Sequence, residues 1–98
     1  MGWAIPWNRL RVLDLDGQGV SDEGVREIVK ELSRRPDLSP LRWLGLANNN
    51  LHADAVRALV NASEDRLKLY HLDVRNNGLS ASQIASLRER FPEAEIMR

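Results

Sequence analysis

The sequence predicts an α/β fold in which three parallel strands lie on one side and three helices on the other. An apolar pattern occurs three times, starting at Leu10, Leu41 and Leu69, and therefore at intervals of 31 and 28 residues. Each copy begins with alternating apolar and polar residues, as half-buried strands do, and continues into apolar residues at helical spacing. Strand–helix–strand connections within one sheet are right-handed almost without exception, so the helices are expected to share one face. A fixed period of this size indicates an array of stacked units.

The repeated pattern is Leu-x-x-Leu-x-Leu-x-x-(Asn/Gln)-x-(Leu/Val), with Val74 in the third leucine position of the last copy. It resembles the leucine-rich repeat, and its spacing is similar to that of the long, intracellular, ribonuclease-inhibitor-like class. The resemblance covers residues 10–91 and implies a short right-handed solenoid, with the strands on the concave side and the helices on the convex side. It also implies that Asn49 and Asn77 hydrogen-bond loop backbone groups. Gln18 departs from the pattern, and a looser first turn is expected there.

The first unit, 10–40, is predicted to contain a strand over 12–16, where apolar and polar residues alternate. Glycines follow at once and indicate a turn. Ser21 is a favourable N-cap for the next helix, and the two acidic residues after it suit a helix N-terminus. Pro36 is expected to end that helix.

The second and third units are predicted to repeat this order. Unit 41–68 has a strand over 43–47, followed by three asparagines that indicate a turn. Unit 69–91 has a strand over 70–75 and an Asn-Gly turn. Its helix is expected to begin with a capping box that starts at Ser80, and a proline directly after the unit ends it.

Both ends of such an array need a cover, because the terminal units would otherwise expose apolar surface. Residues 1–9 are predicted to form an N-terminal cap in which Trp3 and Trp7 cover the open end. The same tryptophans would also suit an exposed docking site or self-association, and a remnant of a longer protein is a third interpretation. Residues 92–98 are predicted to form a C-terminal cap or a partial fourth strand through Ile96.

Composition narrows the classes of function. The 98 residues suit one small domain, with 29% charged and 43% apolar residues and a formal net charge of +0. A nucleic-acid partner is not expected, because the chain has no basic stripe. The chain has no cysteine, so disulfides and thiol chemistry are excluded and the cytoplasm is the expected location. No membrane association is expected either, since no segment approaches the roughly 20 apolar residues of a membrane span.

Strand periodicity assigns the side chains to two faces. The strand leucines are expected to point into the core, and the residues between them to form columns on the concave face. Trp43 is the most informative residue of these columns, because Trp, Tyr and Arg dominate interface hot spots. An equally weighted alternative is that Trp43 packs on its neighbours and stiffens the sheet. The predicted binding residues are Arg11, Arg42, Trp43, Tyr70, His71, Asp73 and Arg75.

No catalytic, metal or cofactor site is predicted. Segment 14–19 is similar to the start of an EF-hand calcium loop, but Val25 stands where a bidentate glutamate is needed. His52 and His71 lie far apart in the repeat and have no cysteine beside them, so neither a catalytic base nor a metal site is expected.

The predicted function is therefore a non-catalytic module that binds another protein through the concave face. The alternative is a structural or capping segment of a larger leucine-rich-repeat array, or a module that self-associates. The repeat motif is specific for a fold but weak evidence for a function.

Overall fold

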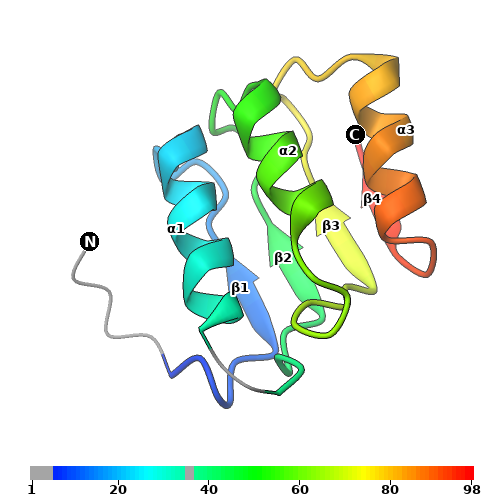
Figure 1. Cartoon of the computed structure of the whole chain (residues 1–98). Coiled ribbons are helices and arrows are strands. Elements are labelled where there is room, and N and C mark those ends of the chain that lie inside the picture. Colours follow the sequence, from blue (N-terminus) through cyan, green and yellow to red (C-terminus); the bar gives the residue numbers. More distant parts are fainter. Residues whose placement is uncertain (1–5, 35–36) are drawn as a thin grey trace.

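Three helices cover one face of a single parallel sheet in the computed structural model, which describes residues 6–34 and 37–98 (Figure 1). The strand order follows the chain, β1-β2-β3-β4. The α/β class and the parallel pairing are confirmed, but the sheet formed by the described residues has four strands rather than three. The elements are β1 (Val12–Asp14), α1 (Asp22–Ser33), β2 (Trp43–Gly45), α2 (Ala53–Asn61), β3 (His71–Asp73), α3 (Ala81–Arg90) and β4 (Glu95–Met97).

Equivalent residues of successive units lie side by side across the sheet. Val12 pairs in register with Trp43, and Trp43 pairs with His71. The first three strands have three regular residues each, which is shorter than predicted. Their backbone pairing nevertheless continues beyond these ends, because the amide N of Leu15 donates to the carbonyl O of Gly45 at 2.8 Å. The register confirms that the first, second and third units share one column at these positions.

The turns after β1, β2 and β3 use the same backbone conformation. Two residues of every turn lie in the left-handed region, with φ between 54° and 70°. Glycine adopts this region readily, and asparagine tolerates it better than most other residues. The first turn uses glycine at both positions, the second asparagine at both, and the third one of each. These residues are Gly17, Gly19, Asn48, Asn50, Asn76 and Gly78.

Two buried asparagine side chains connect neighbouring turns. The Oδ1 of Asn77 accepts hydrogen bonds from the amide N of Asn49 and of Leu51, both at 3.0 Å, and its Nδ2 donates to the carbonyl O of Leu46 at 2.9 Å. Asn49 does the same one unit earlier, where its Oδ1 accepts from the amide N of Val20 at 3.0 Å. The expected structural role of both asparagines is confirmed, since each satisfies buried backbone groups of the preceding unit.

The helix starts follow the sequence closely. The Oγ of Ser21 accepts a hydrogen bond from the first turn of α1 at 3.3 Å. The predicted capping box of α3 is present, with the Oγ of Ser80 accepting from the amide N of Gln83 and the Oε1 of Gln83 accepting from the amide N of Ser80. Helix α1 ends at Ser33, and Pro36, the expected terminator, lies outside the described residues. None of the helices in the described ranges is long and apolar enough to cross a membrane.

The apolar core lies between the sheet and the helices. Leu44 and Leu72 of the sheet are fully buried, as predicted. Leu15 was also expected in the core, but it is only half-buried, because it lies beside the open edge of β1. The helices contribute buried apolar side chains from the faces that their periodicity predicts, among them Val25, Ile28, Leu32, Val56, Leu59, Ile84 and Leu87.

The two ends of the described chain pack against this core. Trp7 is 5% exposed and packs in the core, as the cap interpretation expects. This position corrects the idea of a docking or self-association surface at Trp7, because its indole is not available on the folded surface. Trp3, the other residue of that idea, lies outside the described residues. At the opposite end Ile96 pairs in register with Leu72 and is partly buried. Of the two forms predicted for residues 92–98, a cap or a partial fourth strand, the structure has the fourth strand.

Candidate functional site

The sheet face that points away from the helices, here called the open sheet face, presents two stacked rings. Trp43 and His71 are register partners on β2 and β3, and alternation along each strand places both opposite the buried leucines. Their ring centroids are 4.9 Å apart, with an angle of 6° between the ring planes. A Cβ atom at Gly45 would lie 2.7 Å from the Cζ3 of Trp43, so the indole lies over a position that only glycine fits. Trp43 therefore packs on its neighbours, and it remains half-buried rather than fully covered.

Within the described part of the chain, one polar atom of the stacked rings lacks a hydrogen bond that would offset the cost of its burial. The Nε2 of His71 is buried and has no hydrogen-bond partner among the described residues. An unpaired buried polar group of this kind costs about 1–3 kcal/mol. The stack with Trp43 holds the imidazole in place, but it does not satisfy that nitrogen.

Next along β3, a buried carboxylate is neutralised by an arginine. The Nη2 of Arg75 lies 2.7 Å from the Oδ2 of Asp73, and its Nε lies 3.0 Å from the Oδ1. The Asp73 side chain is 2% exposed, whereas that of Arg75 is 51% exposed. The hydrogen bond from Arg75 lowers the pKa of Asp73, and the same bond raises the pKa of Arg75. This fork-to-carboxylate geometry fixes the exposed guanidinium in one orientation on the open sheet face.

A third group surrounds Tyr70, directly before β3. Its side chain is 49% exposed, and both the guanidinium carbon of Arg42 and the Nζ of Lys68 lie 5.8 Å from the ring centroid. The Nη1 of Arg42 also donates to the carbonyl O of Ser39 at 2.6 Å, so Arg42 is anchored at its tip. Tyr70 therefore offers an exposed aromatic ring within cation–π distance of two cations.

The structure brings together six of the seven predicted binding residues as three contacting pairs. These pairs are Trp43 with His71, Asp73 with Arg75, and Arg42 with Tyr70. Arg11 is exposed beside them, and only its backbone carbonyl contacts another member, accepting from the amide N of Arg42 and of Trp43.

Two residues that the prediction did not include belong to the same surface. Val12, the register partner of Trp43, is 56% exposed. It could have been found from the sequence, because it shares a column with Trp43 and His71. Lys68 lies before the repeated pattern of the third unit, and the sequence contains no periodic signal that would place it over Tyr70.

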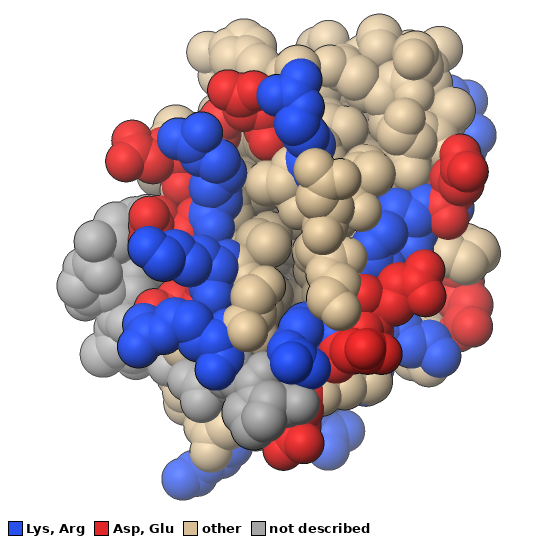
Figure 2. Space-filling view, in the orientation of Figure 1, with Lys and Arg blue, Asp and Glu red and all other residues tan. Residues whose placement is uncertain are grey.

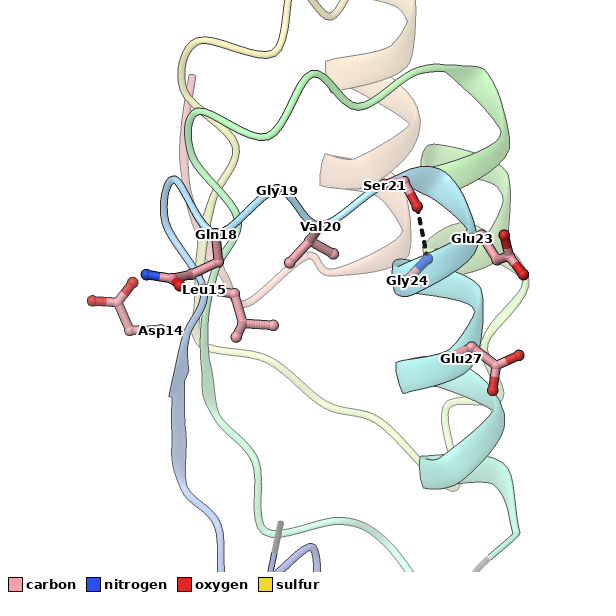
Figure 3. Close-up of a pocket in the computed structure, with 9 residues that line it drawn as sticks. All are labelled: Asp14, Leu15, Gln18, Gly19, Val20, Ser21, Glu23, Gly24 and Glu27. Atoms are coloured by element: carbon pink, nitrogen blue, oxygen red, sulfur yellow. Dashed lines mark hydrogen bonds between the residues drawn. The ribbon is translucent and has the colours of Figure 1, made fainter. Parts of the chain in front are cut away.

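Cavities also occur on the described part of the molecule. One, of about 790 Å³, lies between the turn after β1 and the start of α1 (Figure 3). Another, of about 310 Å³, lies near the end of α3 and is lined by Leu67, Arg90 and Phe91 among others. Neither cavity includes a residue of the three contacting pairs, but Lys68, which lies over Tyr70, lines the second. The open sheet face is thus an unenclosed surface, which suits a macromolecular partner better than a small molecule.

The described residues hold no group of three or more histidine, cysteine, aspartate or glutamate side chains placed to hold a metal ion. The hydroxyl oxygens of Ser21 and Ser80 accept hydrogen bonds as helix caps, as predicted. On the helix side the charges are mixed, with Lys and Arg side chains over α1 and Asp and Glu along its outer margin (Figure 2).

No model of a known protein family matches this chain, and no curated protein sequence matches it either.

Proposed function

We propose that this chain is a leucine-rich-repeat solenoid of the ribonuclease-inhibitor-like class that binds another protein, without catalysis, through the open sheet face. The repeated leucine pattern and the two asparagines that bond the turn of the preceding unit support the family assignment. The parallel strand order, with all helices on one side, is compatible with a short solenoid whose open sheet face is concave.

One observation favours the open sheet face and the residues directly before β3: aromatic and cationic side chains are gathered there and held in place. Trp43 lies stacked on His71, and Tyr70 lies 5.8 Å from both Arg42 and Lys68. Aromatic and arginine side chains with restricted freedom lose little entropy on binding, which is why they dominate the energetics of protein interfaces. Val12 adds exposed apolar surface at the end of the same row.

A catalytic role has little support from these groups. His71 is the nearest candidate for a general base, but its Nε2 is buried under the stack and no described side chain bonds to it. A general base must reach the proton that it removes within about 3 Å. A surface without enclosure also cannot exclude water from a reaction.

The proposal can be tested by affinity capture from cell lysate with three forms of the chain. The sheet-face variant combines Arg11→Ala with Tyr70→Ala. The matched control combines Arg57→Ala with Leu38→Ala, which also removes one exposed arginine and one exposed apolar side chain, but at positions that form no part of the proposed site. Circular dichroism melting of each form checks that the fold is retained.

The expected result is a protein that wild type and control retain equally and that the sheet-face variant retains about tenfold less, as the loss of a hot spot predicts. Equal retention by all three forms would show that the open sheet face is not the binding surface. Retention of nothing by wild type would favour the alternative, a structural segment of a larger array.

A further inference from the structure

The first strand has an unpaired edge. In a parallel ladder alternate residues direct their backbone N–H and C=O groups to opposite sides. Leu15 bonds toward β2, through its amide N and the carbonyl O of Gly45, so Val12 and Asp14 direct theirs away from the sheet. No residue of the described ranges pairs with those outward groups. An open strand edge of this kind is a template for the pairing of a further strand.

A cavity lies beside the C-terminal end of this strand. It has a volume of about 790 Å³ and is here called the β1 groove (Figure 3). The side chains of Leu15 and the buried Val20 form its apolar part. Asp14 lines it from the strand and points to the side opposite Leu15, while Glu23 and Glu27 line it from α1 with carboxylates on the outer side of the helix (Figure 3). No lysine or arginine of the described residues lines it. The β1 groove therefore combines an apolar floor with acidic residues at its rim.

The third feature is an amide that has no partner. Asn49 and Asn77 each reach back to the backbone of the preceding unit: the Nδ2 of Asn49 donates to the carbonyl O of Leu15 at 2.9 Å, and that of Asn77 to Leu46 at 2.9 Å. Gln18 is at the equivalent position of the first unit and lines the β1 groove. Its side-chain amide is exposed and makes no hydrogen bond within the described ranges. A strand placed beside β1 would give it the backbone partner that the other two amides have.

We propose that the edge of β1 is a second docking site, which binds an extended segment of a partner protein that carries lysine or arginine side chains. The segment pairs with the outward backbone groups of Val12 and Asp14, in the parallel sense that the rest of the sheet uses. The amide of Gln18 bonds its backbone, an apolar side chain enters the β1 groove, and cationic side chains approach Glu23 and Glu27. Strand addition of this kind obtains affinity from main-chain hydrogen bonds and specificity from the alternate side chains.

Charge complementarity argues for a basic segment. Asp14, Glu23 and Glu27 are the charged residues among those that line the cavity, and placing a further negative charge beside them is unfavourable. The site shares Val12 with the open sheet face, but its cavity and its acidic residues on α1 include none of the contacting pairs around Trp43 and Tyr70.

Three synthetic peptides of equal length test the proposal. One alternates lysine with valine, one alternates glutamate with valine, and one alternates lysine with proline. The lysine–proline peptide keeps the charge but has fewer backbone N–H groups to pair with a strand. Binding to the full chain is measured by fluorescence anisotropy of labelled peptide, and the site by the amide NMR shifts of Val12 and Asp14.

The lysine–valine peptide is expected to bind at least about tenfold more tightly than either of the other two, and to shift the amide signals of β1. Gln18→Ala is expected to weaken it about threefold, and the double variant Glu23→Gln with Glu27→Gln about three- to tenfold. The matched control, Glu64→Gln with Glu89→Gln, removes the same charge from exposed positions outside the groove and should leave binding unchanged.

Equal affinity for the two lysine peptides would overturn strand pairing, because charge alone would then explain the binding. Equal weakening by the groove variant and its matched control would overturn the β1 groove as the site. Sedimentation showing that the chain associates with itself through β1, in competition with the peptide, would identify a second copy as the occupant and overturn the proposed partner.

Discussion

Replacing Asn77 with alanine is expected to lower the free energy of unfolding by about 4 kcal/mol, although the residue lies in a turn. Its Oδ1 accepts from the buried amide N of Asn49 and of Leu51. Alanine would leave both N–H groups unpaired, at about 1–3 kcal/mol each. Its Nδ2 donates to the carbonyl O of Leu46 and of Val74, and each of these bonds contributes about 0.5–1.5 kcal/mol net. The sum falls between about 3 and 9 kcal/mol, and the lower part of that range is expected because such terms are rarely additive.

The measurement is urea-induced unfolding followed by circular dichroism, with the variants Asn77→Ala, Asn49→Ala and Gln18→Ala compared in one series. Asn49→Ala is expected to cost about 2–3 kcal/mol, because its Oδ1 accepts from one buried amide N, that of Val20, rather than from two. Gln18→Ala is expected to cost less than about 0.5 kcal/mol, as an exposed side chain without a hydrogen bond should. If Asn77→Ala fails to fold, the ranking of Asn49→Ala above Gln18→Ala still tests the reasoning. Equal costs at all three positions would refute it.

Three further perturbations test the open sheet face. Gly45→Ala is expected to cost about 1–3 kcal/mol, since its Cβ would lie 2.7 Å from the indole of Trp43 and 2.9 Å from the Oδ1 of Asp16; thermal unfolding should show the indole's share of that cost absent in a Trp43→Ala background, and additive costs would contradict the contact with the indole. His71→Phe keeps the stacked ring but removes the unpaired Nε2, so urea unfolding should show unchanged stability or a gain of up to about 1 kcal/mol, and a clear loss would reveal a partner for that nitrogen. The pKa of Asp73 is lowered by its bond to Arg75, so the stabilisation is complete above the ordinary carboxyl pKa of about 3.9 and is lost as the pH falls below it. The stability gap between wild type and Asp73→Asn should therefore narrow between pH 7 and about pH 3, and a constant gap would contradict the ion pair.

The open sheet face was predicted in its composition but not in its contacts. Strand alternation correctly placed Trp43 and His71 in one column, because the period of a strand is two whatever the fold. It could not show that the indole lies over Gly45, which depends on two side-chain torsions and on the space left by a missing Cβ. Nor could it show that Lys68 lies over Tyr70, because Lys68 is outside every repeated position.

The sequence by itself determined the local parts of this protein. Residues that accept a left-handed φ recur at the same two places of each turn, serines begin two of the helices, and the leucine spacing identifies the core. Each of these features depends on conformational preferences within a few residues, so a repeated local pattern is enough to predict it.

Only the tertiary structure decided which distant groups meet. The amide N of Ala47 donates to the carboxylate of Asp16 at 2.9 Å, and the guanidinium of Arg90 reaches back to the carbonyl O of Ala62 at 2.9 Å. The side chain of Trp7 packs in the core and is not a docking residue. Gln18 lines a cavity, whereas the asparagines at the equivalent positions contact a neighbouring unit. Such contacts depend on how one unit stacks on the next, and the chain closes loops of about 30 residues before any of them can form.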